Sequence, residues 1–234
     1  MSSAKESSDL WAAEYESGGL PSSFRAEPSG AVRDFLPMAL TFGVEPQESV
    51  AIDLGCGTGR NGLYLAERGF TVWAMDIVPA LISQLRSKAE AAGVSARLHA
   101  ICASVCEPWP PDDGLAAVAI DTFCYKHLMD TGDRMAYRQQ LERVLRPGGL
   151  FLLTLASIED GYYGLLPYRS LGAGMRGITD PANGIGSILY EREAVEECFA
   201  NSFSVIRYLE KTKPGTMHGV EYPRVTHVFV MRRR

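Results

Sequence analysis

The feature that most constrains this chain is a glycine-rich segment between two apolar runs. Val50–Leu54 is short and apolar, as expected of a buried strand. Gly55, Gly57 and Gly59 follow it at every second position. Because glycine has no Cβ, the backbone there can turn sharply and come close to a ligand. The segment therefore predicts a strand, a tight ligand-binding turn and then a helix over residues 61–68.

The alternation of strand and helix continues along the chain. Further strands are predicted at 71–75, 97–103, 116–120 and 150–156, and helices at 79–92, 133–145 and 191–200. This order indicates an α/β fold, with a mostly parallel sheet and helices on both of its faces. Two last strands, at 203–210 and 225–232, are joined through Lys213-Pro214-Gly215 without a helix, so we expect them to pair antiparallel.

Two segments depart from this alternation. Residues 1–48 are predicted to form an N-terminal helical cap, with a disordered polar lead over 1–10, then a short helix, a loop and a helix from about 29 to 42. Residues 49–234 form the predicted main domain. Within it, the stretch at about 157–190 is rich in glycine and aromatic residues and is interpreted as a lid-like insertion.

The glycine turn alone does not identify its ligand. Gly57-Thr58-Gly59-Arg60-Asn61-Gly62 also satisfies a dinucleotide fingerprint, so a nicotinamide oxidoreductase is one alternative. Asp53 argues against it, because a carboxylate before the turn suits a cationic ligand group and opposes a pyrophosphate. The next strand ends at Asp76-Ile77, where a carboxylate suits ribose hydroxyls. The alternative for Asp76 is a cap of the helix that begins near Pro79.

Together with Arg146-Pro147-Gly148-Gly149, these motifs resemble the motif series of class I S-adenosylmethionine (SAM)-dependent methyltransferases, from about residue 48 to 156. The resemblance implies a Rossmann-like seven-stranded sheet with a C-terminal antiparallel hairpin. It also implies SAM as the cofactor and S-adenosylhomocysteine as the product. The stretch 57–66 further resembles the tellurite-resistance and thiopurine-type branch of that family.

The resemblance also implies which residues contact SAM. They are Asp53, Gly55, Cys56, Gly57, Gly59, Asp76, Ile77, Ser104, Asp121 and Thr122. The family commonly has an acidic residue for the adenine amino group where this chain has Ala103-Ser104. The Ser104 hydroxyl or backbone groups are therefore expected to contact the adenine. Arg25 is a candidate partner for the SAM carboxylate, with Arg60 as its competitor, and a surface position is the alternative for both.

Candidate catalytic residues follow from the position of ligands beyond the carboxyl ends of parallel strands. Tyr125 and His127 come soon after the fourth strand and are candidates for a general base. His218, between the last two strands, is a third candidate. Each also has a structural alternative, such as packing or helix capping for His127. Trp11, in the cap, is a candidate to cover SAM.

The remaining expectations concern the class of function. A net charge of -5 argues against a general nucleic-acid binder and favours a small-molecule substrate, methylated on oxygen, nitrogen or sulfur. A peptide or RNA methyltransferase and a SAM-binding regulator without turnover are the alternatives. The five cysteines include no C-x-x-C pair, so no metal site is predicted. No membrane segment or signal peptide is predicted either, and we expect a cytoplasmic protein, compatible with a homodimer.

Overall fold

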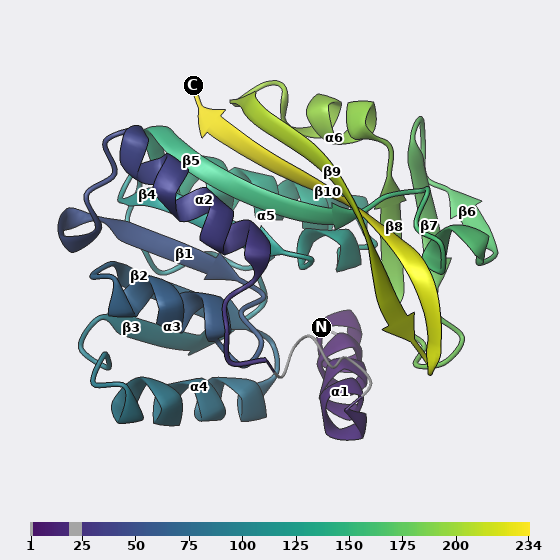
Figure 1. Ribbon diagram of the computed structural model, residues 1–234, viewed down its shortest axis with the longest axis horizontal. Helices are drawn as coiled ribbons and strands as arrows, with labels where there is room; N and C mark the ends of the chain where they lie inside the picture. The colour runs from purple at the N-terminus through teal and green to yellow at the C-terminus, as the bar shows by residue number, and fades with distance from the viewer. Residues whose placement is uncertain (1, 19–24) are drawn as a thin grey trace.

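The computed structural model describes residues 2–18 and 25–234, so part of the loop expected between the two N-terminal helices lies outside the described residues. Seven strands form the central sheet: β1 (Val50–Leu54), β2 (Thr71–Asp76), β3 (Leu98–Cys102), β4 (Ala116–Thr122), β5 (Leu145–Ala156), β9 (Phe203–Met217) and β10 (Val220–Arg233). Their order is β3-β2-β1-β4-β5-β10-β9 (Figure 1). β1 to β5 are parallel, and β10 is antiparallel to both β5 and β9. The predicted fold class is confirmed.

Helices cover both faces of this sheet. α2 (Gly30–Thr41), α3 (Arg60–Glu67) and α4 (Pro79–Ala91) pack on one face, and α5 (Thr131–Val144) and α6 (Arg192–Phe199) on the other. Successive strand residues point to opposite faces, so Ala51 belongs to the first apolar cluster while Ile52 and Leu54 belong to the second. This burial of β1 on both sides explains its continuous apolar run.

The N-terminal cap begins earlier than the sequence predicted. Helix α1 (Ser2–Ser17) includes most of residues 1–10, so the expectation of a disordered lead is wrong for the described part of it. The helix lies beyond the carboxyl ends of the parallel strands, near the tips of β9 and β10 (Figure 1). Its tertiary contacts include a hydrogen bond from Ser8 Oγ to the carbonyl oxygen of Ile77 (2.9 Å). Such contacts leave little trace in local sequence periodicity.

The glycine-rich insertion is not a loop throughout. It holds the short helix η4 (Tyr163–Leu165) and three antiparallel strands, β6 (Tyr168–Ser170), β7 (Met175–Thr179) and β8 (Gly186–Tyr190). These strands have three to five residues each, and the glycines around them hid their pattern. A bridge between Ser157 and Tyr190 attaches the small sheet just beyond the end of β5.

The C-terminal hairpin turns at a different place from the one expected. Pro214 and Gly215 pair with Pro223 and Tyr222 inside the ladder, so the predicted connection through 213–215 is wrong. The chain reverses at His218 and Gly219, whose φ angles are +49° and +82°. Two positive φ angles are what a two-residue type I′ loop requires. Pro214 is tolerated because β9 is an edge strand, where a missing N–H breaks no sheet pairing on the open side.

Candidate cofactor and active site

The glycine turn has the geometry that its sequence predicts. Gly55, Gly57 and Gly59 have φ angles of +64°, +55° and +84°, a region that side chains other than glycine enter only with strain. A Cβ at Gly55 would lie 2.6 Å from the Cβ of Cys124, and one at Gly59 would lie 2.1 Å from Cδ1 of Leu85. The turn is therefore held closely between the segment after β4 and helix α4.

The cap helix α1 lies directly over this turn. A Cβ at Gly57 would be only 2.5 Å from the hydroxyl oxygen of Tyr15. On the same helix, the ring of Trp11 meets the ring of His127 edge-on, with 4.7 Å between ring centres. One helix therefore contacts both the glycine turn and a residue that follows β4.

Asp76 joins the end of β2 to the glycine turn. Its Oδ2 accepts a hydrogen bond from the amide of Gly57 (2.8 Å), and its Oδ1 accepts one from the amide of Val78 (3.0 Å). Burial raises the pKa of Asp76, and these amides oppose the shift. The N-cap residue of α4 is Val78, so Asp76 is not the helix cap of the alternative interpretation. Its carboxylate remains beside the turn, where a ribose contact was expected.

Asp53 is a buried carboxyl without a hydrogen-bond partner. It is 0% exposed, and neither of its oxygens makes a hydrogen bond within the described part of the chain. Helix α3 covers it closely, since a Cβ at Gly62 would lie 3.1 Å from Oδ2. Burial raises the pKa of Asp53 to about 7, while the backbone of Gly62 and the charge of Arg60 oppose the shift. An unpartnered carboxyl at this position would suit a positively charged ligand near the turn, although helix α3 covers Asp53 itself.

Asp121 builds the turn after β4. Its Oδ1 accepts from the amide of Cys124 (2.7 Å), and its Oδ2 accepts from the amide of Tyr125 (2.9 Å) and the hydroxyl of Tyr137 (2.8 Å). These three donors occupy the carboxylate, so its main role here is to shape the segment that faces the glycine turn. Burial raises the pKa of Asp121 to about 7.

Thr122 is linked to the N-terminal segment through Asn61, a residue that the sequence analysis missed. Asn61 Nδ2 donates to Thr122 Oγ1 (3.1 Å), and Asn61 Oδ1 accepts from the amide of Ser29 (2.9 Å). A polar residue on the buried side of the first turn of α3 was the available signal. Asn61 thus connects the start of α2, the glycine turn and the end of β4.

The other expected cofactor residues have local partners or exposed positions. The amide of Cys56 donates to the carbonyl of Met75 (2.9 Å), which fixes the start of the turn against β2. Ser104 Oγ accepts a hydrogen bond from the amide two residues further on (3.2 Å). Arg25 is exposed, and its charge adds to burial in lowering the pKa of Arg60. The two arginines are therefore close enough for their charges to interact.

Tyr125 is part of the core. It is 0% exposed, its ring packs against Tyr137 and Phe199, and its hydroxyl accepts a hydrogen bond from Arg138 (2.7 Å). Burial raises the pKa of Tyr125 to about 12. This placement does not support the role of general base that the sequence suggested for it.

His127 lies under the cap helix with a defined tautomer. Its Nδ1 is 2.8 Å from the carbonyl oxygen of Gly186, so Nδ1 carries a proton and donates, and Nε2 keeps a lone pair. Burial, and then the charge of Lys126, lower the pKa of His127 well below its usual value. A neutral imidazole is therefore present at neutral pH.

His218 belongs to a different cluster. Its Nε2 lies 3.2 Å from Asp180 Oδ2, and Asp180 Oδ1 accepts from the hydroxyl of Tyr162 (2.9 Å). The ring of Tyr162 also contacts that of Tyr222, with 5.3 Å between centres. This cluster joins the insertion to the hairpin tip, and none of these three contacts reaches the glycine turn.

Lys126 is a second residue that sequence analysis missed. Its side chain is almost completely buried and donates to Ser187 Oγ on β8 (3.1 Å). Burial, and then the charge of Arg224, lower the pKa of Lys126 to about 7. The available signal was its place in the sequence between the candidate bases Tyr125 and His127, soon after β4.

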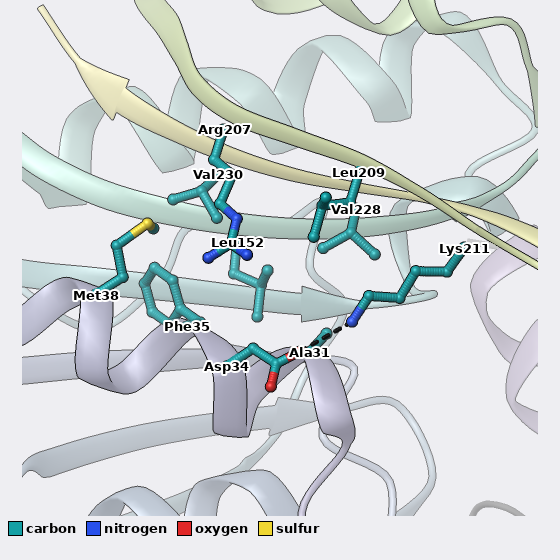
Figure 2. Close-up of a pocket in the computed structure, with 10 residues that line it drawn as sticks. All are labelled: Ala31, Asp34, Phe35, Met38, Leu152, Arg207, Leu209, Lys211, Val228 and Val230. Carbon is teal, nitrogen blue, oxygen red and sulfur yellow. Dashed lines mark hydrogen bonds and ion pairs between the residues drawn. The ribbon is translucent and has the colours of Figure 1, made fainter.

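The hollow in Figure 2 is a separate feature, between α2 and the strands β5, β10 and β9. An ion pair of Lys211 with Asp34 (2.9 Å) crosses its edge. The space open to water is about 10 Å³, which holds about one water molecule. It is therefore a packing gap rather than a candidate ligand site.

Comparison with known proteins relates this region to methyltransferases. The model of a methyltransferase domain matches residues 51–149. Malonyl-[acyl-carrier protein] O-methyltransferase of Salmonella typhimurium is 31% identical over 108 residues, which are 46% of this chain and 39% of that protein. The chain thus spans about two fifths of the length of this curated relative.

Solved structures extend the similarity to nearly the whole fold. The 1,6-didemethyltoxoflavin-N1-methyltransferase of Burkholderia thailandensis, solved with 1,6-didemethyltoxoflavin and S-adenosylhomocysteine, has a TM-score of 0.63 at 18% identity, over 98% of this chain and 89% of that one. A SAM-dependent methyltransferase from Clostridium acetobutylicum has a TM-score of 0.65 at 15% identity, over 96% and 98%. At these identities the similarity establishes the fold.

Within residues 2–18 and 25–234, no three His, Cys, Asp or Glu side chains are grouped so that they could hold a metal ion. Over the same residues, no helix has the length and apolar character needed to cross a membrane.

Proposed function

We propose that this chain is a class I SAM-dependent methyltransferase, which binds SAM at the glycine turn and transfers the methyl group to an oxygen, nitrogen or sulfur atom of a small molecule. The observation that carries the proposal is the glycine turn between β1 and α3 in a sheet of order β3-β2-β1-β4-β5-β10-β9, within the region that matches the family model. Ligands of open parallel sheets bind where the strand order reverses, here between β1 and β4.

The residues at the turn fit this cofactor. SAM supplies a methyl group on a positively charged sulfur and leaves as S-adenosylhomocysteine. Gly55, Gly57 and Gly59 keep the turn free of side chains, and Asp76 presents a carboxylate beside it for the ribose. When it is ionised, the unpartnered Asp53 adds negative charge near the turn, which favours a cation over a phosphate.

The chain contributes to transfer mainly by positioning and by excluding water. Holding the acceptor atom and the methyl group within ~3–3.5 Å of each other supplies a large part of the rate. Trp11 and Tyr15 cover the region from the glycine turn to His127, which shields it from solvent. The free lone pair on His127 Nε2 would accept a proton if the acceptor must lose one, although the low pKa of His127 makes it a weak base.

A small substrate is favoured by the cover that α1 provides. Besides the contacts of Trp11 and Tyr15, the side chain of Leu10 lies near Gly184 of the insertion, 3.7 Å from a Cβ placed there. We infer that a site between α1 and the insertion is too narrow for a folded macromolecule. The five free cysteines fit a reducing compartment, so we place the protein in the cytoplasm.

Calorimetry tests the cofactor and product formation tests the reaction. We expect SAM to bind the folded protein, and an absence of heat at millimolar SAM would refute the proposal. Release of S-adenosylhomocysteine in the presence of small hydroxyl, amine or thiol compounds would support turnover. A salt-dependent affinity for RNA would favour a macromolecular substrate instead, and tighter binding of NAD than of SAM would favour an oxidoreductase.

A further inference from the structure

Lys126 has a buried amine without an ion-pair partner. Its side chain is 4% exposed, and no carboxylate of the described chain lies within ion-pair distance of it. Of its three N–H donors, one bonds to Ser187 Oγ, and the ammonium lies 4.5 Å from the ring centre of Tyr163. Burying an ammonium without an ion partner is costly, and a bound anion would offset that cost.

The two acids that act on Lys126 are engaged elsewhere. Asp160 accepts from Arg224 Nε (2.8 Å) and from three backbone amides. Asp180 accepts from the hydroxyl of Tyr162, from His218 and from one backbone amide. Asp160 thus has its acceptor positions engaged, and neither carboxylate lies within ion-pair distance of the lysine. A ligand carboxylate would supply the close partner that this network does not.

The position of Lys126 points to the acceptor side of the site. It lies in η3 (Tyr125–His127), two residues after Cys124, which packs against the glycine turn. The next residue, His127, lies under Trp11. Ser187, the hydrogen-bond partner of Lys126, belongs to the insertion. The amine thus reaches the small sheet from a segment that contacts both the glycine turn and α1.

We propose that Lys126 binds a carboxylate of the methyl-accepting substrate, so that the substrate is a small organic acid. This inference rests on the proposed function. A carboxylate would accept charge-assisted hydrogen bonds from the ammonium and supply the missing counter-charge. The groups that face Lys126 from neighbouring elements are His127 on η3, Ser187 on β8, Tyr163 on η4, Arg224 on β10, and the acids Asp160 and Asp180. Lys126 is in this view a binding residue, not the group that removes a proton.

The test compares acids with their neutral counterparts. Aliphatic and aromatic monocarboxylates, from acetate to benzoate, are each paired with the primary amide, and their affinities are measured by calorimetry with saturating S-adenosylhomocysteine. We expect at least one acid to bind the wild-type protein about ten- to hundredfold more tightly than its amide, as for a hydrogen bond to a charged group. Lys126→Met should abolish that preference. Acids that bind no better than amides, or a preference that survives in Lys126→Met, would overturn the proposal.

Stability and a matched variant complete the experiment. Replacing a buried ion by an apolar residue is often neutral or stabilising, so Lys126→Met should unfold at the same urea concentration as the wild type or a higher one. Lys126→Gln gives the same comparison if the Met variant does not fold. Lys211→Met removes a cation near α2 and should leave the preference unchanged. Wild-type protein that binds SAM but shows no preference refutes only this inference, whereas failure to bind SAM refutes the proposed function.

Discussion

The substitution Asp53→Asn tests whether one buried carboxyl lowers the stability of the ligand-free protein at neutral pH. Burial raises the pKa of Asp53 from the ordinary 3.8 to about 7 in the folded chain. A carboxyl whose folded pKa lies above its unfolded pKa keeps its proton longer in the folded state. Its contribution to stability is therefore complete below about pH 4 and is lost as the pH rises to about 7. The whole shift corresponds to about 4 kcal/mol.

Urea unfolding at pH 5 and pH 8, without ligand, measures this effect. Asparagine has nearly the shape of the protonated carboxyl and does not ionise. Between the two pH values, the free energy of unfolding of the wild type should therefore fall by about 2–3 kcal/mol more than that of Asp53→Asn. At pH 8 the variant should be the more stable protein, because it carries no buried charge without a partner.

Asp121→Asn is the matched control. Burial raises the pKa of Asp121 to about 7 as well, but its oxygens accept three hydrogen bonds. An amide there presents N–H groups to donors, so this variant should lose about 1–3 kcal/mol already at pH 5. The reasoning about Asp53 fails if Asp53→Asn keeps the pH dependence of the wild type, or if it is destabilised equally at both pH values.

Three further substitutions have distinct expected results. Gly59→Ala places a Cβ against Leu85, which is 0% exposed, at a φ of +84°, so urea unfolding should show a loss of about 2–5 kcal/mol from left-handed strain and overpacking; a loss below about 1 kcal/mol would contradict this. Trp11→Ala removes the contact with His127, so the Kd for SAM should rise about three- to tenfold in calorimetry while the urea midpoint stays unchanged. A lower urea midpoint together with weaker SAM binding would show that α1 supports the whole fold. His218→Asn retains a residue that tolerates a φ of +49°, so the Tm should not fall and turnover should stay above about half. A collapse of turnover with an intact Tm would restore His218 as a catalytic candidate.

The parts of the fold that the sequence predicted are those with strong local patterns. The strand Val50–Leu54 was predicted with its observed bounds, and the glycine turn follows from residue types that need positive φ angles. The hairpin turn was misplaced because Pro214-Gly215 is a strong local turn signal that the pairing of β9 with β10 overrides. Tertiary register decided that case, and local propensity did not.

The site was less predictable, because its contacts join distant segments. The tautomer of His127 depends on the carbonyl of Gly186, 59 residues away in the sequence. The burial of Lys126 depends on Ser187, at a separation of 61 residues. No local pattern records such pairs. Asp76 adjoins the turn as expected, but other residues expected to contact SAM, such as Asp121, have partners within the protein that the sequence did not reveal.

The placement of α1 has a consequence for the energetics of ligand binding. The helix contacts the carbonyl of Ile77, the backbone at Gly57 and the ring of His127, which belong to three different strand ends. If the cofactor and the acceptor acid each bind more tightly when α1 is docked, then either ligand stabilises the docked helix that the other one contacts. The two affinities are then thermodynamically linked, and each ligand must strengthen the binding of the other by the same factor. Measuring the Kd for S-adenosylhomocysteine with and without a bound acid gives that factor, and a ratio of one would show that the helix docks independently of both ligands.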